Sequence, residues 1–554
     1  MMMFSRAACR PALGFLVVSL TGLVGLDGGE AAAQGIFDTA KSGPFTSSYF
    51  GEATYSAGGG CFGSYLHGSA MSASGLAVGG AGTICETPYG SVFAVEVPIV
   101  WAANMAGGGL GSGAVTALAL PEARLSNFVS GSATGVDAAG KTVVGVVLGA
   151  DGTQANYDIY PYIWQASTAG AFAGVTPTQL PLHGADTDGA AYGISPNAAY
   201  ATGWSGTLQF NASWPHGILT GTSTMQAAIW NLSTNSVQLL GATPDPVSSP
   251  ASSGKAVADN GTVVGWYGLF PRGAFTNDVN LARGSGLLLS DTDQFGDYAT
   301  IWQPKPFVWT LASGTMTQLG MTPLNNSSTT YAYGEARALN AGSGSVATGS
   351  VAVGWLGNSA TNFEAVRWST TDNWATHSTL QLATVAPTDT DNLGRLGAVA
   401  NAVDASGSNV VGRVEYACTA SSSGLCSQAV YWSVTSDGQS SSGATLASIL
   451  ASLGVGTANV TLTDATGIAV SATSSSSNIL ILGSGHRNDA DSTQDLFLVQ
   501  LTRTASTPTD TAPTSGSITS VLEQRASLAS LGVIANQGVT ATDAAMGALA
   551  TAAD

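Results

Sequence analysis

The stretch that decides the fold covers residues 132–145 and reads SATGVDAAGKTVVG. It joins two short runs of small and β-branched residues through Asp-Ala-Ala-Gly, a strong signal for a β-hairpin. The same pattern returns along the chain. Clear copies are AAYGISPNAAYATG (190–203), KAVADNGTVVG (255–265) and ANAVDASGSNVVG (400–412), and weaker copies lie at 69–80, 335–354 and 463–483. A hairpin that recurs in this way indicates a repeat architecture.

A second module follows the hairpins and ends in Trp. It reads VPIVW, YPYIW, QAAIW, KPFVW, EAVRW and QAVYW, which end at Trp101, Trp164, Trp230, Trp309, Trp368 and Trp432, and DLFLVQ (495–500) fills the seventh place. A third β-prone run, such as TQLPL or VQLLG, comes after most of them. The sequence therefore predicts an all-β fold, a seven-bladed β-propeller of four-stranded antiparallel blades, with one Trp packed between neighbouring blades. A β-solenoid is the alternative, but its coils usually run ~20–30 residues.

Composition divides the rest of the chain. Residues 1–33 predict a signal peptide, since two arginines precede an apolar run and three alanines precede an expected cleavage site before Gln34. A retained N-terminal anchor is the alternative. Residues 34–501 form the predicted propeller, 502–517 a Thr/Pro/Ser linker and 518–554 an Ala/Leu-rich tail, helical or disordered. A β-prone segment at 49–55 is expected to supply the outer strand of the last blade, so that both chain ends close the ring.

Charge and cysteine content narrow the possible partners. The net charge is −18, with only 16 Lys and Arg, so nucleic acid is not expected as a partner because phosphate contacts need clustered cations. No integral membrane span is expected after signal cleavage, and the protein is predicted to be secreted or held at the cell surface. In that oxidising compartment, Cys61–Cys85 and Cys418–Cys426 are predicted disulfides. Metal binding by these cysteines is the alternative, although no CxxC spacing supports it.

The search for chemistry predicts no catalytic residues and no cofactor. Gly-x-Ser-x-Gly, His-Glu-x-x-His and P-loop motifs are absent from the sequence, and the five histidines are scattered between different units. Paired acids are candidate ligands for a structural Ca²⁺, with solvated turns as the alternative; they are Asp186/Asp188, Asp291/Asp293, Asp389/Asp391 and Asp489/Asp491. Trp204, Trp266 and Trp355 each follow the module glycine and are the candidate ligand-binding residues, by stacking on a sugar or an apolar ligand. Packing between blades is the alternative for these rings.

The hairpin followed by x-Ala-x-x-Trp resembles the bacterial extracellular HAF-repeat family over about residues 68–501. The His that names the family is replaced here, as in Gln226-Ala227-Ala228. The resemblance implies propeller-like repeats associated with autotransporters, without the C-terminal barrel here. We expect a non-enzymatic adhesion scaffold whose loops contact an extracellular glycan or protein. A secreted hydrolase or lyase acting on an extracellular polymer is the alternative. The oligomeric state is not predicted.

Overall fold

A computed structural model describes the chain within residues 61–520. The described ranges are 61–86, 92–102, 115–121, 129–150, 157–208, 210–211, 218–219, 224–244, 250–269, 304–326, 328–340, 350–359, 362–389, 392–419, 425–435, 437–455, 460–472, 476–487, 494–504 and 515–520. The fold is all-β with antiparallel sheets, as predicted. Among the described residues no helix is long and apolar enough to cross a membrane.

Strands that follow one another in the chain pair antiparallel, in groups that we call units 1 to 7. Unit 1 holds β1 (Cys61–Met71), β2 (Leu76–Glu86), β3 (Val92–Ala102) and β4 (Val115–Ala117). Unit 2 holds β5 (Val129–Val136), β6 (Thr142–Ala150), β7 (Tyr157–Gln165) and β8 (Thr178–Gln179). Unit 3 holds β9 (Asp188–Ile194), β10 (Tyr200–Thr207), β13 (Thr224–Asn231) and β14 (Ser236–Leu239), with the small hairpin β11 (Phe210–Asn211) and β12 (Ile218–Leu219) between β10 and β13.

The remaining units repeat this order. Unit 4 holds β15 (Pro250–Val257), β16 (Val263–Leu269), β17 (Lys305–Trp309) and β18 (Met316–Gln318), followed by the 3-10 turn η2 (Leu324–Asn326). Unit 5 holds β19 (Tyr333–Leu339), β20 (Ser350–Ser359), β21 (Asn362–Thr370) and β22 (Ser378–Gln381). Unit 6 holds β23 (Asn392–Val403), β24 (Asn409–Cys418), β25 (Leu425–Val434) and β26 (Ser441–Thr445), followed by α4 (Leu446–Ser452). Unit 7 holds β27 (Val460–Ala472), β28 (Ser476–Arg487), β29 (Gln494–Thr504) and β30 (Ser515–Ser520).

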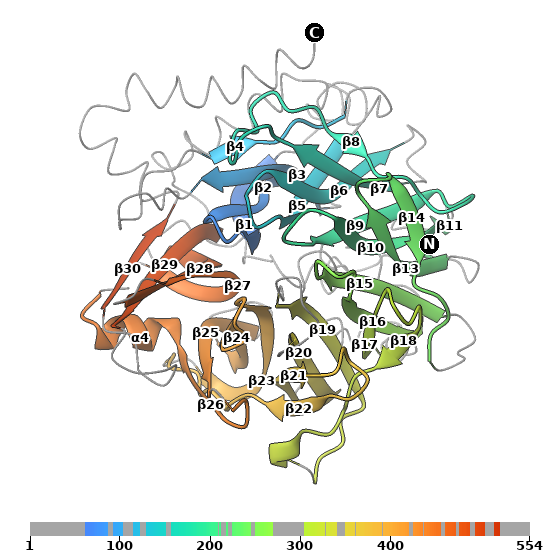
Figure 1. Cartoon of the computed structure of the whole chain (residues 1–554). Helices are drawn as coiled ribbons and strands as arrows, with labels where there is room; N and C mark the ends of the chain where they lie inside the picture. The colour runs from blue at the N-terminus through green and yellow to red at the C-terminus, as the bar shows by residue number, and fades with distance from the viewer. Residues whose placement is uncertain are drawn as a thin grey trace, which may run out of the picture.

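The units follow one another around a ring (Figure 1). Their first strands lie innermost, each beside the first strand of the next unit, and β27 lies beside β1. The third strand of a unit runs parallel to the first strand of the next where they meet, at Met225–Ala251 and Phe363–Gly397. The pair Gln494–Tyr65 repeats this contact between units 7 and 1. The ring therefore closes, and the fold is propeller-like.

The hairpin between the first and second strands is built by a short polar side chain at its start. In unit 2, Asp137 Oδ1 accepts hydrogen bonds from the backbone N–H groups of Lys141 and Thr142. In unit 6, Asp404 accepts in the same way from Ser408 and Asn409. Gly140 and Gly407 hold the left-handed φ angles of +68° and +74° that these turns need. The predicted hairpin signal is thus explained by local hydrogen bonding.

The recurrent Trp of the second module is buried in each of its six copies, as predicted. Four indole N–H groups donate to a carbonyl that follows the outer strand of the preceding unit. The pairs are Trp164 to Ala119 (2.7 Å), Trp230 to Pro181 (2.7 Å), Trp368 to Gly320 (2.8 Å) and Trp432 to Ala383 (2.9 Å). Each ring therefore fills the space between units and also ties its own unit to the one before.

Trp309 allows the contribution of this hydrogen bond to stability to be measured, because its buried Nε1 has no hydrogen-bond partner among the described residues. Trp230→Phe is expected to cost about 1–2 kcal/mol more than Trp309→Phe, since only the former leaves a buried carbonyl unpaired. Both changes create a similar cavity, so the difference isolates the hydrogen bond. Urea denaturation of both variants provides the measurement. Equal losses would show that the indole contributes packing alone.

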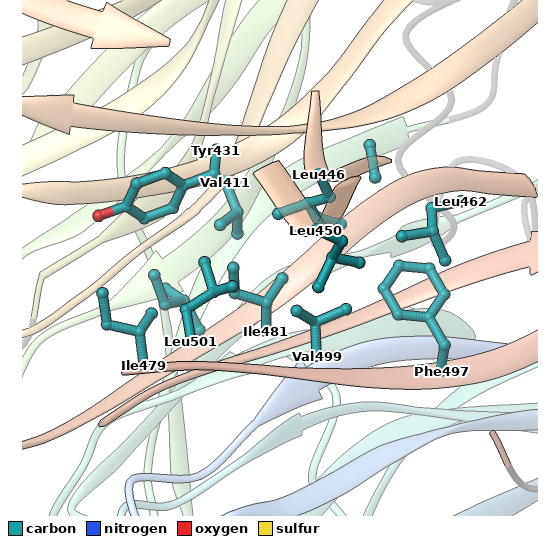
Figure 2. Packing of buried hydrophobic residues seen from close by; sticks show 13 residues of the cluster. Val411, Tyr431, Leu446, Leu450, Leu462, Ile479, Ile481, Phe497, Val499 and Leu501 are labelled. Carbon is teal, nitrogen blue, oxygen red and sulfur yellow. The ribbon is translucent and has the colours of Figure 1, made fainter. Parts of the chain in front are cut away.

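Apolar side chains from adjacent units form the core between them. Figure 2 shows the cluster between units 6 and 7, in which Leu446 and Leu450 of α4 lie between the two sheets. Tyr431 and Val411 come from unit 6, and Phe497 is among the residues that come from unit 7. A similar cluster joins unit 7 to unit 1 around Trp101, Leu480 and Leu498. Burial between neighbours, including the first and last units, stabilises the ring.

The outer strand of unit 7 corrects the expectation for ring closure. β30 pairs with β29 from Phe497–Ser520 to Thr502–Ser515 and so occupies the edge that the sequence analysis assigned to residues 49–55. Residues 49–55 lie outside the described residues. β29 also reaches Thr504, and β30 spans the boundary at 517/518 that the sequence analysis drew between linker and tail. The edge strand therefore comes from the C-terminal segment, and the first and last units meet through the Tyr65–Gln494 strand pair and by packing.

The two cysteine pairs differ in what the structure describes. Cys418 and Cys426 form the predicted disulfide, with an S–S distance of 2.03 Å, at the end of the β24–β25 hairpin. Cys61 and Cys85 are backbone register partners of β1 and β2. Cross-strand partners lie close enough for a disulfide. The Cys61–Cys85 disulfide stays a prediction.

Mass mapping of non-reduced peptides tests this second disulfide. We expect one peptide pair that links Cys61 to Cys85, beside the pair that links Cys418 to Cys426. A free thiol at Cys61 or Cys85 would contradict the prediction, while the Cys418–Cys426 pair serves as the internal control.

Candidate functional site

A β-bulge interrupts the first strand of each unit, opposite the glycine of the Val-Val-Gly module. A Cβ on Gly354 would lie 1.9 Å from the carbonyl oxygen of Glu335, and one on Gly412 would lie 1.9 Å from that of Val399. Only glycine allows this approach of the two strands. The extra residues, which we call the bulge residues, are Ser69, Thr134, Tyr192, Lys255, Arg337, Asn401 and Thr466.

The bulge residues occupy equivalent places on the innermost strands. Bulges often redirect a side chain near a functional site. In units 3 to 5 the bulge residue is a long polar side chain, in unit 6 it is an amide, and in units 7, 1 and 2 it is a small hydroxyl residue. The bulge residues therefore differ in size and charge around the ring.

The long bulge residues make contacts from one unit to the next. Lys255 Nζ lies 4.2 Å from the centre of the Tyr192 ring and 3.7 Å from Glu335 Oε1. Arg337 Nε lies 3.0 Å from the other oxygen of Glu335. Arg337 Nη1 donates to Asn401 Oδ1 at 2.8 Å. These contacts link units 3, 4, 5 and 6.

The chain of contacts continues into unit 7. Asn401 Nδ2 donates to Asp464 Oδ1 at 2.7 Å, and Arg413 Nη1 donates to Asp464 Oδ2 at 2.9 Å. Arg413 also donates from Nε to Glu415 at 2.6 Å. We call this whole set the inner network; it consists of Tyr192, Lys255, Glu335, Arg337, Asn401, Arg413, Glu415 and Asp464.

Burial and pairing fix the charges of the inner network. The Glu335 and Arg413 side chains are each only 4% exposed. Burial alone would raise the pKa of Glu335, but Arg337 and Lys255 hold it below its ordinary value. Burial alone would lower the pKa of Arg413, but Asp464 and Glu415 raise it above its ordinary value. Both groups therefore stay ionised near neutral pH, which is unlike a general acid or base with a pKa near the working pH.

Trp204, Trp266 and Trp355 are buried in the fold, and each side chain is at most 1% exposed. Trp204 Nε1 donates to the Tyr192 hydroxyl at 3.1 Å, and Trp355 Nε1 donates to Glu335 at 3.3 Å. Burial this deep favours packing between units over stacking on a ligand. In unit 6 the equivalent position, directly after the module glycine Gly412, is occupied by Arg413, which belongs to the inner network.

The other candidate residues do not form a shared site where they are described. Asp188 accepts from the backbone N–H groups of Ile159 and Leu208, so its carboxylate is used within the fold. Asp186 accepts from Ser205, and Asp389 from Tyr416. No group of three His, Cys, Asp or Glu suited to a metal occurs among the described residues. The remaining acids lie outside the described residues: Asp291, Asp293, Asp391, Asp489 and Asp491.

The histidines come from different parts of the ring. His67 lies in unit 1, His183 between units 2 and 3, His377 in unit 5 and His486 in unit 7, while His216 lies outside the described residues. His377 Nε2 accepts from the backbone N–H of Gly320 at 2.7 Å, and burial lowers its pKa. A neutral His377 thus serves as a structural acceptor.

The two rims of the ring differ. First and third strands run in the same direction, so the connections between second and third strands leave from one rim, which we call the loop rim. In unit 3 this connection contains β11 and β12. In unit 4 it joins Leu269 to Lys305. The Cys418–Cys426 disulfide also lies there. The opposite rim carries the connections between first and second strands, which are tight hairpins except in unit 5, and the connections between third and fourth strands.

The comparisons with known proteins bear on the fold alone. No family model matches the chain, and no curated protein matches it. Similar solved structures include TolB from Acinetobacter baumannii, with a TM-score of 0.24 and 10% identity over 69% of this chain and 66% of that chain. A TolB structure from Agrobacterium tumefaciens has a TM-score of 0.27 and 9% identity over 58% of this chain and 81% of that one.

A third similar structure is the Trypanosoma rangeli sialidase in complex with sialic acid, with a TM-score of 0.28 and 9% identity over 71% of this chain and 56% of that one. The chain therefore spans less than two thirds of the Acinetobacter and Trypanosoma proteins. With TM-scores this low, the likeness carries no argument about activity, and the class of the protein rests on its own strand order: an all-β, propeller-like ring.

Proposed function

We propose that this chain is an exported, non-enzymatic binding scaffold, built as a seven-bladed β-propeller with one four-stranded blade per unit. The pairing of four successive strands within units supports the blade count. The hairpin and Trp modules support membership of the HAF-repeat type. The residues 1–33 support export, and N-terminal sequencing of the exported protein should begin at Gln34.

The difference between the two rims carries this proposal. The two longest connections within units, from Thr207 to Thr224 and from Leu269 to Lys305, and the disulfide lie on the loop rim, whereas the connections on the opposite rim are shorter. Binding residues in proteins are commonly carried on loops that a rigid scaffold positions. The proposed partner is an extracellular glycan or protein, contacted by the loop rim.

The inner network supports a scaffold over an enzyme. Its carboxylates and cations neutralise one another, and the directions of the pKa shifts of Glu335 and Arg413 keep them ionised. A hydrolase or lyase acting on a polymer needs a group that exchanges protons near the working pH. The inner network instead acts to hold units 3 to 7 in place.

Binding by the loop rim is tested with the mature chain, residues 34–554, on a glycan array and on immobilised extracellular proteins. Two variants shorten the loop rim, one with residues 209–223 and one with residues 270–303 replaced by an Asn-Gly turn. Asn235→Gly is the matched control on the opposite rim, because Asn235 already has a φ of 49° that glycine adopts freely. We expect at least a tenfold loss of binding in a shortened variant and none in the control.

Two results would contradict the proposal. Binding that survives both shortened loops, with unchanged melting, would show that the loop rim is not the contact surface. Release of reducing ends from an extracellular polysaccharide, dependent on the protein, would favour the enzyme.

A further inference from the structure

The peptide group of Gly320, which follows the outer strand of unit 4, is held by unit 5 through both its oxygen and its nitrogen. The carbonyl oxygen accepts from Trp368 Nε1 at 2.8 Å and from Thr379 Oγ1 at 3.2 Å. The N–H group donates to His377 Nε2 at 2.7 Å. This last hydrogen bond, which we call the His377 contact, joins units 4 and 5 through a side chain that can take up a proton.

Unit 6 holds the equivalent peptide group of unit 5 with a different side chain. The carbonyl oxygen of Ala383 accepts from Trp432 Nε1, and its N–H group donates to Ser441 Oγ at 2.8 Å. His377 and Ser441 occupy the same register position, because each lies two residues before the strand partner of the module Trp of its unit. Imidazole titrates between pH 5 and 8, whereas a hydroxyl does not. The same contact is therefore titratable between units 4 and 5 and insensitive to pH between units 5 and 6.

The connection that ends at His377 has a strained backbone. In this segment, which we call the 371–377 loop, Asn373 and Trp374 have left-handed φ angles of 56° and 70°, which are uncommon for residues other than glycine. Trp374 is only 4% exposed and packs in a cluster of apolar residues from units 4 and 5. Strained residues persist only where the surrounding structure holds them. The burial of Trp374 and the His377 contact together hold this loop against unit 4.

Asp372 is the charged group that acts on His377. The facing segment of unit 4, residues 315–323, contains no titratable side chain, and neither does β22 of unit 5. Asp372 raises the pKa of His377, against the larger effect of burial, which lowers it. Hydrogen bonds from Thr376 lower the pKa of Asp372 itself to about 2. Asp372 therefore stays ionised while imidazole titrates, and a response in that range belongs to His377.

We propose that His377 makes the seam between units 4 and 5 sensitive to acid. A proton on Nε2 turns the acceptor into a donor, so the hydrogen bond from Gly320 is lost and the 371–377 loop releases Trp374 from its cluster. His377 is half-buried, so a proton reaches it in the folded ring. The folded pKa of His377 is lower than its ordinary value, so its stabilising contribution is complete above the unfolded pKa and is lost as the pH falls through the folded pKa. This device does not rest on the proposed function.

Hydrogen exchange of the purified protein, read by mass spectrometry of short peptides, tests the proposal. The amide of Ala383 is the internal reference, because both amides undergo the same change in exchange chemistry with pH. From about pH 8 to about pH 5, protection at Gly320 should fall about fivefold more than at Ala383, the equivalent of one hydrogen bond. Exchange within the 371–377 loop should rise in parallel. An equal fall at Gly320 and Ala383, or a loop that stays protected, would overturn the proposal.

Three variants separate the proton from other effects of acid. His377→Gln keeps an acceptor that does not titrate, so Gly320 should stay protected at both pH values. His377→Phe keeps a ring without an acceptor, so Gly320 should exchange quickly at both. Ser441→Ala is the matched control and should lower the protection of Ala383 equally at both pH values. If His377→Gln loses protection at Gly320 on acidification as the parent does, another group carries the response and the proposal is wrong.

Discussion

Glu335→Ala is expected to lower the free energy of unfolding by about 3–5 kcal/mol, because it leaves two buried cations without their shared carboxylate. Lys255 and Arg337 lie on either side of this carboxylate, at 3.7 and 3.0 Å. Trp355 also loses the acceptor for its indole N–H. The contacts join units 4 and 5, so the loss should appear as a lower midpoint in urea for the whole ring.

Glu364→Ala is the matched control for this variant. Glu364 pairs with Arg395 across units 5 and 6, but the two side chains are 13% and 19% exposed, and water can replace the lost partner. We expect a loss of about 1 kcal/mol, as for pairs near the surface. If Glu335→Ala costs no more than Glu364→Ala, the inner network does not hold the units together.

The same carboxylate predicts a dependence of stability on pH. The pKa of Glu335 is lower in the folded chain than its ordinary value of 4.5, because Arg337 and Lys255 oppose the effect of burial. Its contribution is therefore complete above the unfolded pKa and is lost as the pH falls through the folded pKa. Glu335→Gln should be less stable than the parent at neutral pH, and the gap should narrow below pH ~4. A gap that stays constant with pH would contradict the assignment.

The hairpins and the recurrent Trp were predictable because their signals are local. A turn such as Asp137 to Gly140 needs only its own residues. A Trp such as Trp230 ends the same module in six units, so its equivalence between units can be seen in the sequence. The burial of Trp204, Trp266 and Trp355 was harder, since equivalence between units shows that they share a position but not whether that position is open. These residues are buried because they lie on the second strand of their units, between two sheets.

The inner network could not be read from any one unit. Lys255, Arg337 and Asn401 are single polar residues in strands that otherwise read as small and apolar. Aligned on the module glycine they fall at one position, and that alignment is the signal that would have found them. β30 was missed for a different reason: residues 505–514 separate it from β29, and the sequence SGSITS resembles the linker before it. β30 is a strand because it pairs with β29, and that pairing leaves no signal in its own sequence.

Gly354→Ala is expected to cost about 3 kcal/mol or more, because overpacking against a backbone atom cannot be relieved by a side-chain rotation. The new Cβ would lie 1.9 Å from the carbonyl oxygen of Glu335. To make room, β19 must move away from β20 at the bulge, and that movement carries Glu335 and Arg337 out of the inner network. The variant should therefore lose more than the steric cost alone, with a large drop in the melting temperature measured by circular dichroism.

Gly174→Ala separates the close approach from the general cost of replacing glycine. Gly174 has a φ of +71°, and a Cβ added there would meet nothing within 4 Å, so its change meets only backbone strain of about 1 kcal/mol. Gly412→Ala should behave like Gly354→Ala, since its Cβ would meet the carbonyl oxygen of Val399 at the same 1.9 Å. If Gly354→Ala and Gly412→Ala melt like Gly174→Ala, the first strands can shift freely. In that case the bulges do not fix the positions of the inner network.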